Sequence, residues 1–537
     1  MGYDAQVCED EGPTSISCIQ GGDTAYILLC TALVWLMTPG LAFFYGGLVR
    51  EKNFLNTLYM NIAAIGVVTI QFVWFGYSFA FSWYSKGFGD GAWVGLRDLG
   101  RGPNPDYATS IPHDIYSFFQ LTFAIITTAV ISGAMVERIS FRAWVVFIFL
   151  WTTVVYDPIG NTPSPSLKSL RKPTRYLSAA HWVWSAKTTS SGYELGFLRD
   201  LGALDFAGGT VVHMASGFSA LTACVICGPR HNVDLKSPPE AHNVPLFVLG
   251  TAMLWFGWFG FNGGSALAAN DLSSLAMYNT QIAACAAFTT WMVIDAFFKR
   301  AVTVVGPLSG AVVGLVAITP CCGFVHLQSS LAIGCISSLV AWPLMHIKSR
   351  YLAGRWLMKY VDDSLDVFLC HGVGGMLGAF LLGWFASLEV NPAGADGILF
   401  GGGKLLGWQV KRSLDISAPS RASLLTLFDS QIIAILITIA LSVVGTAAIL
   451  IFLKFTIGIR YSPQTQGKGV DSVAHLSLAY RFSEENPDGS VVIEDEEGGS
   501  LASRIAEWNL LDFTVRHIRK CLGKEAAADD TEMKEVN

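Results

Sequence analysis

Residues 205–228 read DFAGGTVVHMASGFSALTACVICG, and residues 366–388 read DVFLCHGVGGMLGAFLLGWFASL. Each is a mostly apolar run with one histidine inside it, His213 in the first and His371 in the second. A helix needs about 20 such residues to cross the hydrocarbon core of a membrane. Because an ionisable side chain is unfavourable inside lipid, the two histidines are candidate functional residues.

Nine further runs of the same kind bring the predicted number of transmembrane helices to eleven. The expected spans are 24–48, 58–83, 113–136, 142–159 (which could resume at 179–185), 205–228, 244–268, 275–298, 302–325, 331–347, 366–388 and 427–456. A buried helix of a soluble protein rarely exceeds about 14 apolar residues, so these runs have no soluble counterpart.

Composition agrees with a chain embedded in membrane lipid. Of the 537 residues, 52% are hydrophobic and 14% are charged, against about 25% charged in an ordinary soluble domain. This balance excludes a disordered chain, a nucleic-acid-binding protein and a small disulfide-rich domain. We therefore expect an all-α polytopic membrane protein.

Charge divides the chain into a leader (1–23), a membrane domain (24–460) and a polar tail (461–537) that carries the net negative charge. Lys and Arg gather in the loops after the odd-numbered spans, such as Arg50 and Lys52 after the first, whereas the short loops after the sixth and eighth spans have none. Since positively charged short loops face the cytoplasm, we expect an outer N-terminus and a cytoplasmic C-terminus.

The two histidines occupy the fifth and tenth spans, which are equivalent positions if spans 1–5 and 6–10 are repeats. Repeats of five helices must be inverted, and inverted repeats place a transport site near the midplane at their interface. An aspartate precedes each histidine in a similar context, LDF at Asp205 and LDV at Asp366. The alternatives are that each histidine is a hydrogen-bonded core residue and that each aspartate only caps a helix.

Aromatic residues gather near the expected outer side: Phe123 in FFQLTFAII, Trp184 in AHWVWS, and Trp258 and Phe261 in WFGWFGFNGGS. Aromatic belts at membrane interfaces are common, so anchoring alone is one interpretation. A ring beside a hydroxyl such as Ser265 can also attract a small cation through its π face.

Five motifs, in this order, resemble the ammonium transporter (Amt/Mep/Rh) family, and are closest to its Mep/Amt branch in fungi and other microbial eukaryotes. They are LMTPGLAFFYGGLVREKN (36–53), ERISF (137–141), GALDFAGGTVVH (202–213), WFGWFGFNGGS (255–265) and DVFLCHGVGG (366–375). The resemblance implies an inverted five-plus-five repeat with a final helix, and a homotrimer in the plasma membrane with one pore per subunit. It implies a transporter of ammonium or methylammonium rather than an enzyme, with no cofactor.

The resemblance also implies roles for ten residues. Matched to the family's motifs, Trp184 and Ser265 attract ammonium in an outer vestibule, and Phe123 and Phe261 close that vestibule. Gln120 and Trp258 line the constriction, and His213 and His371 form the histidine pair of the pore. Asp205 matches the essential acidic residue, and Asp366 matches the related acid of the tenth helix.

These residue types suit ammonium for a physical reason. Ammonium and potassium are similar in size and charge, but only ammonium can lose a proton. A dry apolar pore disfavours a bare cation and so favours ammonia, for which imidazoles offer hydrogen-bond partners. Whether the proton crosses separately or ammonia crosses alone stays open, and a sensor that binds ammonium without conducting it is a second alternative. An intramembrane metalloenzyme would need several clustered ligands.

Three features depart from the family pattern. Segment 160–179 is an insertion or a retained intron, and the outer loop 391–423 is long. The tail reads GVDSVAHLSLAY at 469–480, where Leu476 and Ser477 replace the family's Gly and Glu. In the family this tail couples subunits and gates the pore, so a cytoplasmic regulator is a further expectation.

Two more predictions concern the ends of the chain. Residues 500–522 alternate apolar and basic side chains, which is typical of an amphipathic helix on the inner membrane surface or on a partner. A tail helix with no docking site is the alternative. Cys8 and Cys18 lie on the expected outer side and either pair or stay free.

Overall fold

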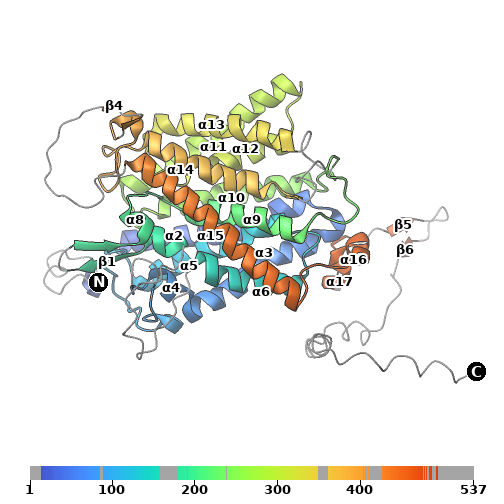
Figure 1. Ribbon diagram of the computed structural model, residues 1–537, viewed down its shortest axis with the longest axis horizontal. Helices are drawn as coiled ribbons and strands as arrows, with labels where there is room; N and C mark the ends of the chain where they lie inside the picture. The colour runs from blue at the N-terminus through green and yellow to red at the C-terminus, as the bar shows by residue number, and fades with distance from the viewer. Residues whose placement is uncertain are drawn as a thin grey trace, which may run out of the picture. The chain divides into compact units, whose positions relative to one another are not determined.

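The computed structural model describes residues 14–84, 89–157, 179–189, 192–237, 239–348, 361–402, 404–405, 408–409, 426–475, 477, 479–480, 483–485 and 491–493. The chain forms two units, Met1–Ala479 and Tyr480–Asn537. In the second, the hairpin of β5 (Ser483–Glu485) and β6 (Val491–Ile493) is antiparallel. The first is a bundle of long helices that α15 (Leu427–Thr456) crosses obliquely (Figure 1).

Nine helices of the described chain are long and apolar enough to cross a membrane. They are Gly21–Leu48, Glu51–Phe81, His113–Ala134, Gly209–Cys227, Val244–Gly264, Asp271–Phe298, Leu327–Ile347, Phe368–Phe385 and Leu427–Thr456. Two shorter apolar helices, Phe141–Tyr156 and Val305–Ile318, fall on the predicted spans 142–159 and 302–325. The prediction of a helical multi-pass membrane protein is confirmed, and each predicted span coincides with a helix, although these two are short.

The long elements of Figure 1 are α2 (Gly21–Leu48), α3 (Phe54–Gln71), α5 (His113–Val130), α6 (Phe141–Trp151), α9 (Ala215–Cys227), α10 (Val244–Gly264), α11 (Asp271–Phe298), α12 (Val305–Ile318), α13 (Leu327–Ile347) and α14 (Gly374–Phe385). The five-residue α4 (Tyr77–Phe81) ends the second span. The short ones are η1 (Ile16–Cys18), η2 (Glu51–Asn53), η4 (Val94–Leu96), η5 (Ile131–Ala134), α7 (Ala179–Trp184), β1 (Ala186–Thr189), β2 (Gly192–Leu195), α8 (Phe197–Asp200), η11 (Ile398–Phe400), β3 (Lys404–Leu405), β4 (Trp408–Gln409), α16 (Pro463–Lys468) and α17 (Val470–Ala474).

Four segments of the described spans are π-helical rather than α-helical. They are η3 (Phe72–Gly76), η6 (Thr152–Tyr156), η7 (Gly209–Met214) and η10 (Phe368–Val373). A π turn inserts an extra residue into a helix and is frequent at functional sites. Two of the four, η7 and η10, contain the histidines singled out by the sequence.

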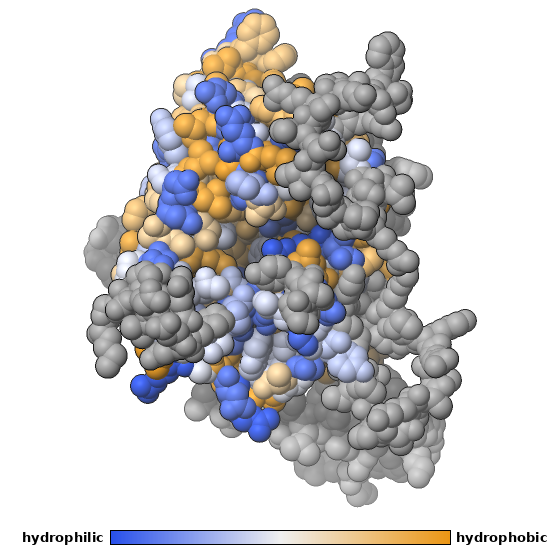
Figure 2. Space-filling view, turned by 90° about the vertical axis from the view of Figure 1, so that its left-hand side faces the viewer, coloured by the Kyte–Doolittle hydropathy of each residue, from blue (hydrophilic) through white to orange (hydrophobic). Residues whose placement is uncertain are grey.

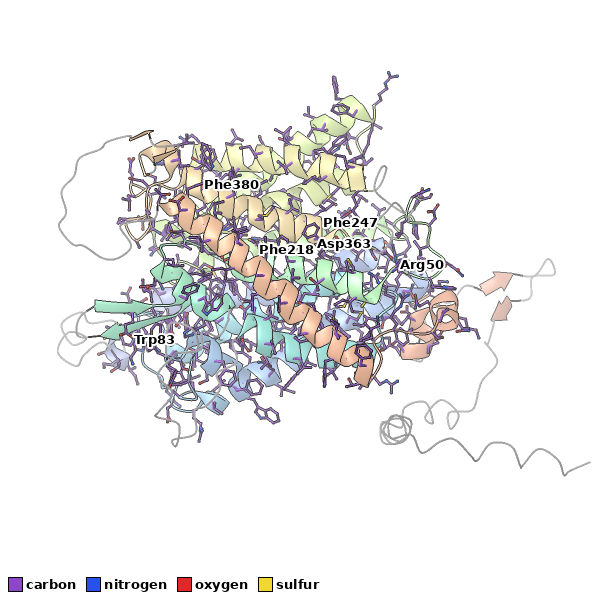
Figure 3. All side chains as sticks on the ribbon, in the orientation of Figure 1. Arg50, Trp83, Phe218, Phe247, Asp363 and Phe380 are labelled. Carbon is purple, nitrogen blue, oxygen red and sulfur yellow. The ribbon has the colours of Figure 1, made fainter. Side chains whose placement is uncertain are left out.

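The first unit has two chemically different ends. The antiparallel hairpin of β1 and β2 lies at one, here called the hairpin end, and α16 and α17 lie at the other, the tail end (Figure 1). Trp83 marks the first and Arg50 the second in Figure 3. Figure 2 looks onto the hairpin end, where hydrophilic residues (blue and pale) mix with apolar ones (orange). Such a mixed surface suits contact with water.

The start of the tail packs with the helical unit, since the first compact unit extends to Ala479. The carboxylate of Asp471 accepts hydrogen bonds from the backbone N–H groups of Leu55 (2.9 Å) and Asn56 (2.8 Å) and thereby caps α3. His475 follows α17 and bonds through Nε2 to the Asn56 Oδ1 at 3.0 Å. The two contacts fix α17 against the first turn of α3.

Several predicted features lie outside the described residues. These are Cys8, the insertion 160–179 up to residue 178, and the amphipathic stretch 500–522. Cys18 is part of a disulfide.

Candidate functional site

Asp205 organises the start of η7. Its Oδ1 accepts hydrogen bonds from the N–H groups of Gly208 and Gly209, both at 2.7 Å, and its Oδ2 accepts one from the N–H of Thr210 at 2.7 Å and one from the Thr210 hydroxyl. A carboxylate at a helix N-terminus satisfies N–H groups that have no partner within the helix. Asp205 therefore fixes the direction in which η7 carries His213 inward.

Asp363 does the same for η10. Its carboxylate accepts hydrogen bonds from the N–H groups of Val367 (3.0 Å) and Phe368 (2.9 Å). Asp363 lies eight positions before His371, which is the offset between Asp205 and His213. The counterpart of Asp205 in the second half of the chain is therefore Asp363.

The predicted pairing of Asp205 with Asp366 differs from this arrangement. The LDF and LDV contexts match, but Asp366 lies only five positions before its histidine, so the match is out of register by three residues. Asp366 caps no helix with its carboxylate and pairs instead with Lys348, with Nζ and Oδ1 2.5 Å apart. No sequence pattern singles out Lys348 or Asp363. Lys348 is one of several basic residues in its loop, and Asp363 is one of several acidic residues.

Glycines let the two histidine-bearing spans touch backbone to backbone. A Cβ at Gly217 would lie 2.1 Å from the backbone N of Gly372, and one at Gly375 would lie 2.7 Å from the carbonyl O of Gly209. Small residues permit such close crossing in membrane helices. The crossing lies within one turn of each histidine and brings the two imidazoles together.

His213 and His371 are hydrogen-bonded through their Nδ1 atoms, which are 3.2 Å apart. Both side chains are buried, and the Nε2 of His213 has no protein partner. A bond between two Nδ1 atoms needs a proton on one and a lone pair on the other, so the two rings must be different tautomers. The free Nε2 of His213 remains available to a small molecule that passes the pair.

Rings stack in series between the hairpin end and this pair. Phe123 and Phe261 are stacked, with centroids 4.2 Å apart. Trp184 packs edge-on against Phe123 at 5.8 Å, and Phe261 lies 5.9 Å from the imidazole of His213. Trp258 is parallel to that imidazole at 5.3 Å. The structure thus brings together the predicted vestibule, constriction and pore residues in that order.

Ser265 and Gln120 lie at the margin of this stack. The Ser265 hydroxyl ends α10 and donates to the carbonyl O of Phe261 at 2.8 Å. Gln120 lies one turn before Phe123 on α5, where its buried Oε1 has no protein partner. The indole N–H of Trp184 is used within the protein, since it donates to the carbonyl O of Asp205 at 3.2 Å.

A narrow cavity of about 10 Å³ lies against the histidine pair. Its lining is apolar except for two imidazoles and an indole: Met37, Leu41, Phe44, Ile126, Val130, Val212, His213, Leu254, Trp258, Phe261, Val312 and His371. A space of this size holds about one water-sized molecule. Such a pore admits a small neutral molecule and strongly disfavours a bare ion.

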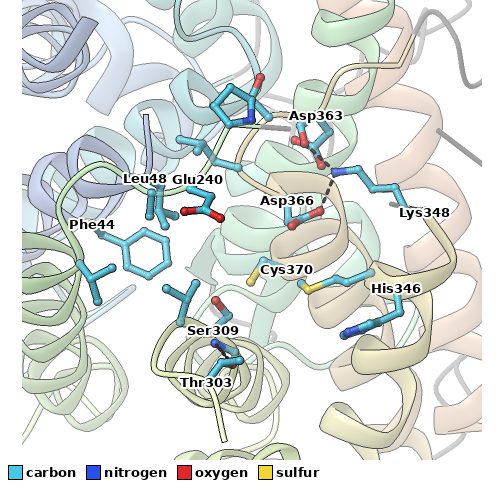
Figure 4. A pocket seen from close by; sticks show the side chains of 18 of the residues that line it. Phe44, Leu48, Glu240, Thr303, Ser309, His346, Lys348, Asp363, Asp366 and Cys370 are labelled. Carbon is cyan, nitrogen blue, oxygen red and sulfur yellow. Dashed lines mark hydrogen bonds and ion pairs between the residues drawn. The ribbon is translucent and has the colours of Figure 1, made fainter. Parts of the chain in front are cut away.

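A second, larger cavity of about 900 Å³ opens at the tail end (Figure 4). Its wall includes Cys370, the neighbour of His371, and Phe44, which also lines the narrow cavity. The larger cavity therefore approaches the histidine pair from the side opposite to the stacked rings.

Two residues of the cavity wall, Arg230 and Asp362, belong to a network of buried charges. Glu137 pairs with Arg50 at 2.6 Å and with Arg230 at 3.4 Å. Arg230 also pairs with Asp362 at 2.9 Å, and the Arg138 guanidinium lies 3.7 Å from the same carboxylate. Burial alone would raise the pKa of the Glu137 carboxyl, but Arg230 and Arg50 hold it below its usual value. Through ion pairs, the network holds four loops of the tail end together.

Known proteins are similar over most of the chain. The sequence profile of the Ammonium Transporter Family matches residues 25–161 and 170–480, and the gap between them falls inside the insertion 160–179. An ammonium transporter of Bacillus subtilis is 37% identical over 466 residues, which is 87% of this chain and 100% of that protein. Ammonium transporter 1 of Schizosaccharomyces pombe is 38% identical over 411 residues, which is 75% of this chain and 74% of that one.

Solved structures are also similar to this fold. The crystal structure of Mep2 from Saccharomyces cerevisiae matches with a TM-score of 0.66 and 31% identity, over 83% of this chain and 88% of that one. The profile match alone covers well over half of the chain, and the B. subtilis relative is matched along its whole length. The chain is therefore a member of the ammonium transporter family.

Proposed function

We propose that this protein takes up ammonium across the plasma membrane by separating it into ammonia and a proton at the histidine pair. Ammonium transport itself follows from membership of the family. The observation that carries the proposed mechanism is the narrow apolar cavity beside His213 and His371, which fits one small neutral molecule.

In this proposal the hairpin end faces outward and the tail end faces the cytoplasm, as the basic loops indicate. Ammonium first meets Trp184, whose π face attracts a cation, and Ser265. The stacked rings of Phe123 and Phe261 then stand in its way. They must separate for each passage, so they act as a gate that keeps water and hydrated ions from the pore.

Beyond the rings a cation is no longer stable, because the cavity is narrow and its lining is mostly apolar. Ammonium gives up one proton and continues as ammonia, which the free Nε2 of His213 can hydrogen-bond. Potassium has no proton to lose and is excluded. The released proton passes along the imidazole pair and rejoins ammonia at the tail end. As it passes, the donor and the acceptor of the hydrogen bond between the two Nδ1 atoms exchange roles. Transport is then electrogenic.

Two further proposals concern assembly and control. Large apolar side chains such as Trp74, Phe297, Phe298 and Phe455 are exposed on the helices and need lipid or other subunits to cover them. We infer a homotrimer with one pore per subunit. The docked α17 offers a cytoplasmic regulator a place to act, because it connects the tail to the first turn of α3.

Growth on scarce ammonium tests the proposed function. A yeast strain without its own ammonium transporters would express the full chain, the chain without 160–179, or His213→Ala, with surface expression checked for each. We expect growth with the full chain and none with His213→Ala. Growth only after the deletion would mean either that the segment is a retained intron or that it blocks the vestibule. No growth from either, with normal surface expression, would contradict transport and favour a non-conducting sensor.

A further inference from the structure

A charged amine, that of Lys348, lines the large cavity at the tail end. Lys348 follows the last turn of α13 and lines the cavity, where its Nζ lies between Asp363 and Asp366 (Figure 4). The Nζ donates to Asp366 Oδ1 at 2.5 Å and to the carbonyl O of Asp363 at 2.6 Å. Lys348 thus presents an alkylammonium group, the chemical relative of the transported ion, to two oxygen acceptors at the inner mouth.

This amine keeps its charge although its side chain is only 21% exposed. Burial would lower the pKa of Lys348, but the charges of Asp366 and Asp363 raise it above its ordinary value. The two other basic residues of the cavity that carry ion pairs have different partners, Arg230 with Asp362 and Lys299 with Asp295. Among the described residues that line the cavity, Lys348 is therefore the cation that pairs with Asp366.

The backbone indicates that the Asp366 side chain is needed where it lies. Asp366 has a left-handed conformation with φ of 55°, which is uncommon for residues other than Gly, although Asp adopts it more often than most. The equivalent position in the first half, three residues after Asp205, is Gly208, also left-handed with φ of 115°. The second half thus carries a carboxylate where glycine would be unstrained, and such strain is typical of functional positions.

We propose that Asp366 and the carbonyl of Asp363 form an exit site for monovalent cations, and that Lys348 occupies it as a tethered ammonium group. This inference rests on the proposed function, because the product cation must form near the inner mouth. The tether slows release, since Lys348 must move aside for each product ion. It also prevents cytosolic potassium, a cation of similar size and charge, from settling at the mouth. Lys348 is thus an autoinhibitory and selective element.

Currents of the full chain in proteoliposomes test this proposal. Ammonium-evoked current would be recorded for wild type, Lys348→Gln and the matched control Lys299→Gln, with internal potassium exchanged for choline at constant ionic strength. Without internal potassium, Lys348→Gln should carry at least the wild-type current. That current should fall about threefold when potassium reaches about twice its dissociation constant. The ammonium-evoked currents of wild type and Lys299→Gln should not change with potassium. A Lys348→Gln current that potassium leaves unchanged would overturn the proposal.

Two further variants sharpen the result. In Lys348→Gln/Asp366→Asn both charges are gone, so sensitivity to potassium should disappear again. Lys348→Arg keeps a tethered cation and should stay insensitive, and potassium block of Lys348→Arg would count against the tether.

A binding measurement on the purified protein needs no transport. Potassium chloride should raise the melting temperature of Lys348→Gln relative to choline chloride, and should not do so in wild type, because only the variant has a vacant site. Absence of ammonium current in wild type would defeat the proposed function. Equal potassium effects on the melting temperatures of the two proteins would defeat the exit site alone.

Discussion

The bond between His213 and His371 joins the two halves of the pore at the level of single atoms. The Nδ1 atoms share one proton at 3.2 Å, so each ring holds the other in place and leaves the Nε2 of His213 free. Both rings are buried among apolar side chains that cannot replace either partner. Loss of one imidazole therefore leaves the other with an unpaired polar atom.

His213→Ala tests this pairing. Loss of the partner leaves the Nδ1 of His371 unsatisfied, which costs about 1–3 kcal/mol. Since about 1.4 kcal/mol is tenfold, we expect ammonium transport to fall at least about fivefold. Uptake of labelled methylammonium at equal surface expression measures the loss. His326→Gln is the control, because its ring lies beside Phe400 and outside the pore. Undiminished uptake by His213→Ala would refute a role for the pair.

Glu137 is the central anion of the tail end. Its side chain is fully buried, and Arg50 and Arg230 both depend on it. Removal of one partner from a buried ion pair typically costs about 3–5 kcal/mol, so Glu137→Gln should lower thermal stability strongly. Glu51→Gln, at an exposed carboxylate nearby, should change it by less than about 0.5 kcal/mol. Similar melting temperatures for the two purified variants would contradict the network.

The pH dependence of this network has a defined sign. The folded pKa of Glu137 is held below its ordinary value of about 4.3 by Arg230 and Arg50, against the effect of burial. Its contribution to stability is therefore fully present above that value and is lost as the pH falls through the folded pKa. We expect a constant melting temperature from this group between about pH 5 and 8 and a fall below about pH 4 that Glu137→Gln lacks.

At the scale of elements, the crossing of η7 and α9 with η10 and α14 positions the histidines. A Cβ at Gly217 would meet the backbone N of Gly372 at 2.1 Å, and neither backbone can give way without moving an imidazole. Gly217→Ala should therefore destabilise the protein by about 1–3 kcal/mol and abolish transport. At Gly66 on α3 a Cβ meets nothing within 4 Å, so Gly66→Ala should retain both. Full transport by Gly217→Ala would show that the crossing can relax.

The docking of α17 on α3 responds to pH through His475. Burial lowers the pKa of His475, which lies edge-on between Tyr59 and Phe141. The neutral ring is thus favoured when docked. This contribution to stability is present above the ordinary pKa of about 6.5 and is lost as the pH falls below that value through the lower pKa of the docked ring. We expect amide exchange of residues 463–475, corrected for intrinsic rates, to accelerate between about pH 7.5 and 5.5. His475→Gln should remove this pH-dependent acceleration. An acceleration that persists in the variant would show that another group causes it.

Sequence predicted the elements better than their irregularities. Hydropathy located the nine long apolar helices of the described chain, because a membrane requires about 20 apolar residues for each crossing. It could not reveal η7 or η10, since a π turn changes hydrogen bonding and not composition. The similar neighbours of Asp205 and Asp366 suggested equivalence, whereas the offset to each histidine identifies Asp363. The contact between Lys348 and Asp366 depends on how two loops fold together, which no local pattern specifies.

At the scale of the molecule, the helical unit separates two aqueous sides by one narrow apolar passage. Aromatic rings close it toward the hairpin end, and a wide charged cavity approaches it from the tail end. Between them lies room for about one small neutral molecule. In the proposed mechanism, selection rests on chemistry, because ammonium can become neutral in this space and an alkali cation cannot.

The most direct measurement is the current that purified full-length protein carries in proteoliposomes after a jump in external ammonium, compared with an equal jump in potassium. Separate passage of ammonia and a proton predicts a charge-moving current with ammonium, none with potassium, and loss of the ammonium current in His213→Ala. Equal currents with both ions would contradict deprotonation as the basis of selection. Uptake of labelled methylammonium without any current would contradict the separate movement of the proton.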